Sequence, residues 1–265
     1  MDRPSTGRGA GRRMRERLPV LGAGLAGLLG VALLVVAVVL PDGSGSQAPA
    51  AARSTTSAAP QAVASRTAEP DPAQVPVAQL PDGAWIDATA ASTGVEARVL
   101  RAYAGAALRL EREQPGCRLG WNTLAAIGAV ESEHGTIDGS VVTDDGVADP
   151  PIVGVALDGG DVRALRDTDD GEVDGDDRWD RAVGPMQFLP STWERWGADG
   201  DGDGRADPQH VDDAALAAAR YLCHGERDLT HGPDWVAAIS SYNEGSEYHA
   251  RVLEQARSLA SLAAR

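Results

Sequence analysis

The longest apolar run of the chain lies near its N-terminal end. Residues 18–40 contain no charged side chain, whereas several arginines lie within residues 1–17. As a helix of about 23 residues, this run would be roughly 34 Å long, enough to cross a hydrocarbon core of about 30 Å. The pattern predicts a transmembrane signal-anchor at 18–40 behind a cytoplasmic basic tail at 1–17. A signal peptide that is cleaved near Ala48 to Ala50 is the alternative.

Two further segments follow this run. Residues 41–81 are rich in Ala, Pro and Ser and offer little that forms a core, which predicts a disordered linker. Residues 82–265 are enough for one domain. We expect this domain to lie outside the cell membrane, in an extracellular or periplasmic space, held by the anchor or secreted if the anchor is cleaved.

Apolar residues at helical spacing recur through the domain. They predict helices at 95–113, 121–133, 211–223, 235–242 and 246–262. Ser191 and Glu194 have the spacing of a capping box for a short helix that ends at Gly197. A short hairpin is expected within 141–155, and there is no convincing series of strands. The predicted fold class is therefore mainly α.

One carboxylate interrupts an apolar stripe of the predicted 121–133 helix. On a period of 3.6 residues, Leu124, Ile127 and Glu131 fall on one face, whereas Glu133 points to roughly the opposite side. A half-buried glutamate is harder to ionise, so its pKa rises towards the range of a general acid near neutral pH. Glu131 is therefore the first candidate for catalysis, and Glu133 is expected to face water.

Charge and cysteine content exclude some classes of protein. The formal net charge is −15 and basic patches are missing from the exported part, which argues against nucleic-acid binding. Its two cysteines, Cys117 and Cys223, are expected to form a disulfide because bridges persist outside the cell. Two buried free thiols are the alternative. The histidines have no zinc-ligand spacing, so no metal-dependent chemistry is predicted.

Aspartates are concentrated between the predicted helices at 157–181. A solvated loop explains such a composition. The alternative is that some of these carboxylates bind a cation, because hard oxygen ligands suit Ca²⁺. The sequence leaves both interpretations open.

Four short motifs follow one another in the domain. They are Glu131–Gly135, Ala182–Trp193, Asp199–Asp207, and Ser241–Asn243 with Tyr248 shortly after it. Each is weak alone, but the ordered series resembles the lytic murein transglycosylases of the membrane-bound B type, in particular their actinobacterial branch. The resemblance covers residues 84–265. It implies a lysozyme-like transglycosylase domain that binds peptidoglycan glycan strands, most simply as a monomer.

The resemblance also implies site residues. Glu131 matches the single catalytic acid and base of the family. The expected substrate-binding residues are Ser132, Met186, Gln187, Phe188, Tyr242, Asn243 and Tyr248. Met186 and Phe188 equally suit a hydrophobic core, and Tyr248 can simply pack a helix. Buried amides such as Gln187 and Asn243 need polar partners or a ligand.

The third motif begins like a Ca²⁺-binding EF-hand loop. Asp199, Asp201 and Asp203 stand at the first ligand positions, and Arg205 offers its carbonyl oxygen. The standard last position holds His210, a poor Ca²⁺ ligand. In the longer loop that the resemblance implies, the late carboxylate is Asp213, with Asp212 as a rival. A structural Ca²⁺ is expected here, and an Asp-Gly turn without metal is the alternative.

Glycoside cleavage usually needs two carboxylates, whereas these motifs supply one. The resemblance implies a lyase in which the muramyl C6 hydroxyl attacks the anomeric carbon of its own sugar, giving a 1,6-anhydro product without a required cofactor. The muramyl hydroxyl is then the nucleophile, so the reaction needs neither a water molecule activated by a second carboxylate nor a second carboxylate that attacks the sugar. A non-catalytic peptidoglycan-binding or wall-assembly module and a hydrolytic muramidase are the alternatives.

Overall fold

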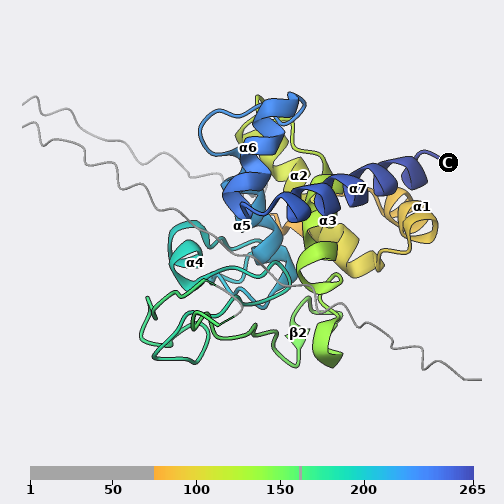
Figure 1. Cartoon of the computed structure of the whole chain (residues 1–265). Coiled ribbons are helices and arrows are strands. Elements are labelled where there is room, and N and C mark those ends of the chain that lie inside the picture. Colours follow the sequence, from red (N-terminus) through yellow and green to blue (C-terminus); the bar gives the residue numbers. More distant parts are fainter. Residues whose placement is uncertain (1–74, 161–162) are drawn as a thin grey trace, which may run out of the picture.

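The computed structural model describes residues 75–160 and 163–265 (Figure 1). Helices make up most of the ordered secondary structure, as the sequence predicted. The α-helices are α1 (Gly83–Thr93), α2 (Ala97–Glu113), α3 (Trp121–Ser132), α4 (Pro190–Trp196), α5 (Val211–Cys223), α6 (Gly232–Tyr242) and α7 (Ser246–Ala263). Two 3-10 turns, η1 (Val77–Gln79) and η2 (Ile137–Gly139), complete the helical elements of these residues.

The core is built around α5, whose residues are almost all buried. Small alanine side chains let neighbouring helices approach it closely, and α2 packs along its length. Helix α3 packs against both α2 and α7, which places it in the middle of the bundle. Helix α3 therefore presents most of its surface to protein, and the side chains at its C-terminal end lie where the bundle meets the loops.

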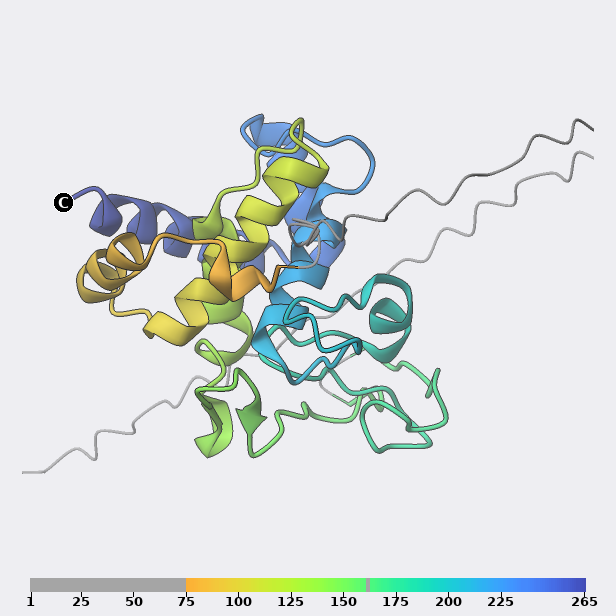
Figure 2. The same ribbon diagram turned by 180° about the vertical axis from the view of Figure 1, so that it is seen from behind.

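The segment between α3 and α4 consists mainly of loops, which form one side of the molecule in Figures 1 and 2. It contains the hairpin that the sequence predicted within 141–155. Strand β1 (Val141–Val142) pairs antiparallel with β2 (Ala148–Asp149), and Val141 faces Asp149 across the ladder. Isolated bridges, such as Val153 with Val183, tie the loops to one another.

Five of the predicted helices are present close to their expected bounds. Helix α5 has the bounds predicted for it, and α2, α3, α6 and α7 differ by a few residues at their ends. The capping box expected at Ser191 is wrong, because α4 begins at Pro190 and its N-cap is Leu189. Gly197 does end this helix.

The packed domain begins before residue 82. Val77 in η1 is fully buried, and its amide donates to the carbonyl oxygen of Gly200 at 2.8 Å. Its carbonyl group lies directly against Gly105 of α2, where a Cβ atom would come within 1.9 Å of the oxygen. Residues 75–81, which the sequence pattern placed in the linker, therefore belong to the folded unit.

Gly105→Ala is expected to destabilise the domain because its new methyl group would overlap the Val77 carbonyl. Overpacking of this kind costs about 1–3 kcal/mol. Gly116→Ala is the matched control, since a Cβ atom there meets nothing within 4 Å. Chemical denaturation of both variants measures the difference, and equal stability would contradict the seating of residues 75–81 on α2.

The predicted disulfide is present. Cys117 and Cys223 are joined, their Cα atoms lie 5.5 Å apart, and both residues are buried. The bridge connects the loop before α3 to the last residue of α5. It thus ties the element that carries Glu131 to the central helix of the core.

The predicted anchor at 18–40, the basic tail at 1–17 and the linker up to residue 74 lie outside the described residues. Within the described part of the chain, no helix combines the length and apolar character needed to cross a membrane.

Candidate active site

Glu131 lies in the last turn of α3 and is only 6% exposed. The helix ends one residue later, at Ser132, and Glu133 is its C-cap in the left-handed conformation, with φ 52°. Glu133 is therefore exposed, as predicted, but because the chain leaves the helix there and not because of its position on the helical face. Glu131 remains as the carboxylate of α3 that points into protein.

Burial raises the pKa of Glu131 from 4.5 to about 7. Two contacts oppose this rise: a hydrogen bond from Tyr248 and the positive charge of Arg251. A carboxyl group with this pKa populates both protonation states near neutral pH, so it can give a proton and later take one back.

Tyr248 holds the carboxyl group directly. Its hydroxyl donates to Glu131 Oε1 at 2.6 Å, between helices α7 and α3. Tyr248, which was expected to bind substrate, contacts the acid and packs in the core, and it is not among the residues that line the pocket beside Glu131. The hydrogen bond leaves the other carboxyl oxygen, Oε2, as the one available for proton transfer.

Ser132 secures the end of α3 to the second motif. Its hydroxyl donates to the carbonyl oxygen of Pro185 at 2.6 Å and accepts from the amide of Gly135 at 2.8 Å. Ser132 is fully buried and does not line the pocket beside Glu131. The contacts of Ser132 are those of a supporting residue that fixes the two motifs relative to each other, and its contact with substrate stays a prediction.

The second motif forms a tight turn between Val183 and Phe188, whose backbones pair in both directions. Gly184 has φ 73°, and a Cβ atom there would lie 1.8 Å from the carbonyl oxygen of Pro208. Gln187 adopts φ 51°, a left-handed conformation, and its side-chain amide nitrogen donates to the Gly184 carbonyl at 3.0 Å. The turn thus holds the Gln187 side chain in a defined position.

Tyr242 and Met186 connect this turn to α6. The Tyr242 hydroxyl donates to the carbonyl oxygen of Met186 at 2.7 Å, while the Met186 side chain is fully buried in the core. The sequence did not decide whether the Met186 side chain packs in the hydrophobic core or contacts substrate, and the structure places it in the core. Its expected substrate contact is therefore not supported, although its carbonyl orients Tyr242.

A small pocket opens beside Glu131. The residues that line it are Glu131, Gln187, Phe188, Leu189, Thr192, Tyr221, Tyr242 and Asn243. Four predicted site residues besides Glu131 thus meet in one place, although they come from separate parts of the chain. Among the described residues lining the pocket, Glu131 is the only one with an ionisable carboxyl group.

Asn243 is almost fully buried at the end of α6. Its side-chain oxygen accepts from the amide of Gly245 at 2.9 Å, and its own carbonyl contacts His249 Nε2 at 2.7 Å. These contacts fix the backbone around Asn243. Its side-chain amide group therefore enters the pocket in one orientation.

Three pocket residues were missed by the sequence pattern: Leu189, Thr192 and Tyr221. Tyr221 lies near the end of α5, and its hydroxyl donates to the carbonyl oxygen of Ser241, next to Tyr242. A tyrosine near the end of an otherwise alanine-rich helix was the available signal. Leu189 and Thr192 follow the Gly184–Phe188 turn directly and gave no signal of their own.

Comparison of the sequence with models of known protein families gives a match in the C-terminal part of the chain. Residues 162–265 match the model of the transglycosylase SLT domain. This match covers less than half of the chain and supports a transglycosylase-type domain in that range. The matched range contains Gln187, Tyr242, Asn243 and Tyr248 but begins after Glu131, which the structure brings to the same pocket. No curated protein and no solved structure matched the chain.

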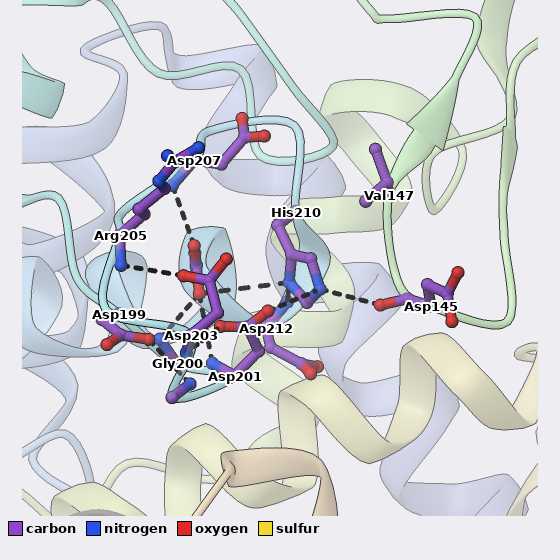
Figure 3. A network of polar contacts seen from close by, with 12 residues as sticks. Asp145, Val147, Asp199, Gly200, Asp201, Asp203, Arg205, Asp207, His210 and Asp212 are labelled. Carbon is purple, nitrogen blue, oxygen red and sulfur yellow. Dashed lines mark hydrogen bonds and ion pairs between the residues drawn. The ribbon is translucent and has the colours of Figure 1, made fainter.

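The Asp199 loop, which Figure 3 shows from close by, contributes to a group of three carboxylates. Oxygen atoms of Asp199, Asp201 and Asp213 lie within 4.8 Å of one another. Asp203, which was expected with them, is not in this group, and its carboxylate accepts from the amide of Arg205. Carboxylate oxygens are hard ligands of the type that Ca²⁺ prefers, although Ca²⁺ takes about six to eight oxygens in all.

The structure also distinguishes Asp213 from Asp212, the two candidates for the last carboxylate of the loop. Asp213 is 2% exposed, and its oxygens accept from the amides of Gly200, Asp201 and Asp207. Asp212 instead forms a bidentate ion pair with Arg98. Asp213 therefore closes the loop at its far end, and Asp212 does not.

Tyr248→Phe is expected to move the alkaline limb of the pH–activity profile to higher pH. The hydrogen bond from Tyr248 lowers the pKa of Glu131, so its removal lets that pKa rise further. A hydrogen bond to a charged group is worth about 1.5–3 kcal/mol, which corresponds to roughly one pH unit or more. Rates measured from about pH 5 to about pH 9 test this shift.

Tyr103→Phe is the matched control, because Tyr103 is equally buried but its hydroxyl contacts His134 at 3.4 Å. Its alkaline limb is expected to coincide with that of the unmodified chain. A Tyr248→Phe profile that is unchanged, or shifted to lower pH, would contradict the assigned contact.

Proposed function

We propose that this protein is a peptidoglycan lytic transglycosylase of the membrane-bound B type, with Glu131 as its single acid and base. It would cleave the β-1,4 bond between N-acetylmuramic acid and N-acetylglucosamine and leave 1,6-anhydro-muramyl ends. The observation that carries the proposal is one buried carboxyl group with a pKa of about 7 in a pocket with Gln187, Tyr242 and Asn243.

In the first step, protonated Glu131 gives its proton to the glycosidic oxygen as the bond from that oxygen to the anomeric carbon breaks. The substrate's own acetamido oxygen bonds to the anomeric carbon and stabilises the positive charge. In the second step, the Glu131 carboxylate takes the proton of the muramyl C6 hydroxyl. The C6 oxygen then attacks the anomeric carbon and displaces the acetamido group, and Glu131 is again protonated.

Two physical arguments favour this mechanism over hydrolysis. A hydrolase usually needs a second carboxylate to activate water or to act as nucleophile, and among the described residues that line the pocket Glu131 is the only carboxylate. An intramolecular hydroxyl gains a large effective concentration, so it needs no activated water. The described aspartates of 157–181 do not line this pocket, so none of them takes the second role.

The N-terminal segment completes the proposal. A transmembrane helix at 18–40 would hold the domain at the outer face of the cell membrane, and the linker would let a monomeric domain reach glycan strands. Support comes from the uncharged run and the arginines before it.

We also propose a structural Ca²⁺ in the Asp199 loop. Asp199, Asp201 and Asp213 would hold it, and the ion would offset the repulsion between their charges. The ion takes no part in glycan cleavage. Binding of Ca²⁺ to metal-free protein, compared with an Asp201→Asn variant, measures this site.

Mass spectrometry of digested peptidoglycan tests the proposed reaction. Purified glycan strands incubated with the full chain are expected to yield muropeptides with 1,6-anhydro-muramyl ends. Reducing muramyl ends would identify a muramidase, and intact strands that still bind the protein would identify a binding module. Either result would overturn the proposal.

A further inference from the structure

A second group of carboxylates lies outside the pocket and outside the Asp199 loop. Oxygen atoms of Asp167, Asp169 and Asp180 lie within 4.8 Å of one another. The three residues come from two stretches that run side by side, since Arg166 and Trp179 form an antiparallel bridge next to them. The sequence left open whether this Asp-rich segment is a solvated loop or binds a cation.

One oxygen of the group has no partner. Asp169 Oδ1 is buried and accepts no hydrogen bond, whereas Asp169 Oδ2 accepts from the amide of Val173 at 2.6 Å. A buried carboxylate oxygen without a donor is costly, and such atoms are rare in folded proteins. This unsatisfied oxygen is an observation separate from the clustering, and it indicates a missing electropositive partner.

The charge of the group is not balanced by side chains. Among the described residues, no arginine or histidine forms an ion pair with Asp167, Asp169 or Asp180, and the chain contains no lysine. Two arginines of the same segment have other partners. Arg181 pairs with Asp176 at 2.8 Å, and Arg166 stacks on the Trp179 ring.

Asp180 is fully buried, although it is a carboxylate in an acidic segment. Its oxygens accept from the amide and the hydroxyl of Thr168, so its position is fixed by the neighbouring stretch. Asp174 is also buried, but the amides of Asp176 and Arg181 occupy its two oxygens. Asp174 thus shapes the loop, while Asp180 joins the group of three.

A shared proton is the competing explanation. Burial raises the pKa of both Asp169 and Asp180, and the neighbouring carboxylates raise it further. A proton would satisfy one oxygen but would leave the other charges of the group facing each other. A divalent ion neutralises two charges at once and accepts several oxygens at the same time.

We propose that Asp167, Asp169 and Asp180 form a second cation site, which takes a hard divalent ion of the Ca²⁺ class. Carboxylate oxygens with flexible geometry favour Ca²⁺ over Mg²⁺, which demands a near-octahedral shell. The ion would supply the partner of Asp169 Oδ1. This site is distinct from the Asp199 loop and uses none of its residues.

The position of this second site gives it a structural role next to the pocket. Asp180 directly precedes Arg181 and Ala182, and the carbonyl of Ala182 accepts from the amide of Gly154 at 2.8 Å. The Gly184–Phe188 turn, which carries Gln187, follows at once. An ion at Asp180 would therefore fix the strand-like stretch that leads into the pocket wall.

Calcium stoichiometry tests this inference on the full chain. Metal-free protein at about pH 7.5, above the ordinary carboxyl pKa, is titrated calorimetrically with Ca²⁺. Asp169→Asn is expected to bind one ion fewer than the unmodified chain, whereas Asp177→Asn, an exposed aspartate of the same segment, is expected to bind the full number. Asp201→Asn removes the Asp199 loop site separately.

The two sites are distinguished by their variants. If Asp169→Asn alone lowers the number of bound ions in a background that carries Asp201→Asn, the second site is established even if the Asp199 loop binds nothing. If Asp169→Asn fails to fold, Asp167→Asn takes its place, because it also removes one carboxylate from the group of three. Unchanged stoichiometry in these variants overturns the inference and leaves a shared proton as the explanation.

Discussion

Replacing Glu131 with Gln is expected to abolish glycan cleavage while the fold is retained. The amide is nearly the same size as the carboxyl group, and its oxygen still accepts from Tyr248. It has no proton to give, so both steps assigned to Glu131 fail. General acid–base groups contribute about 10²–10⁴-fold, and a residue that serves both steps is expected to cost at least about 10³-fold in rate.

Glu133→Gln is the matched control, because Glu133 is only two residues away but exposed at the end of α3. Its release of anhydro-muropeptides is expected to equal that of the unmodified chain. A Glu131→Gln variant that retains most of the activity would remove Glu131 from its assigned role, whatever the products are.

The same substitution has a second expected effect, on stability. The pKa of Glu131 is raised from 4.5 to about 7 in the folded protein, so the folded state binds more protons between these values than the unfolded state. The contribution of Glu131 to the free energy of unfolding is thus fully present below about pH 4.5, and it is lost as the pH rises to about 7. The shift corresponds to roughly 3 kcal/mol.

The neutral amide of the Glu131→Gln protein carries no such penalty, so this variant is expected to be more stable than the unmodified chain above about pH 7. The difference should disappear near about pH 4, where the glutamate is neutral in both states. Urea denaturation of the two proteins at several pH values measures it. A constant difference across this range would show that burial does not perturb this carboxyl group.

The sequence predicted the catalytic candidate because the physical signal at Glu131 is local. A carboxylate that continues the stripe of Leu124 and Ile127 must enter the core of any helix that buries this stripe, and all three residues are buried. The bounds of α5 were predictable for a similar reason. Its central run of Ala, Leu and Arg at 214–220 consists of good helix formers and leaves few alternatives.

Helix α1 was missed because its sequence lacks an amphipathic pattern. Only Ile86 and Thr89 of this helix are buried, and Ala and Thr fill much of the rest. The one clear signal was Asp82, whose side chain accepts from the amide of Trp85 and caps the helix. A cap without an apolar stripe does not distinguish a helix from a turn.

The supporting roles of Ser132 and Met186 depend on tertiary contacts that spacing does not reveal. Ser132 finds its partner far along the chain, as its hydroxyl donates to the Pro185 carbonyl. Met186 presents its carbonyl to Tyr242 while its side chain turns into the core. Motif membership therefore identified the neighbourhood of the pocket but not which atoms face it.

Removing the Cys117–Cys223 bridge is expected to cause the largest loss of stability. The two cysteines are 106 positions apart, and a bridge that closes a loop of this length restricts the unfolded chain strongly. The chain-entropy model gives about 4–5 kcal/mol for such a loop. For a domain of this size, that loss lowers the melting temperature by roughly 10 °C or more.

The bridge is tested in two independent ways, by reduction and by the double variant Cys117→Ala with Cys223→Ala. Both are expected to lower the melting temperature to a similar extent, and a reductant should not affect the double variant further. The effect should extend to catalysis, because Cys117 precedes α3, whose C-terminal turn positions Glu131. If the oxidised and reduced proteins melt together, the connection between α5 and the start of α3 is held by packing around Leu119 and Leu229 instead, since both are buried in the same core as the bridge.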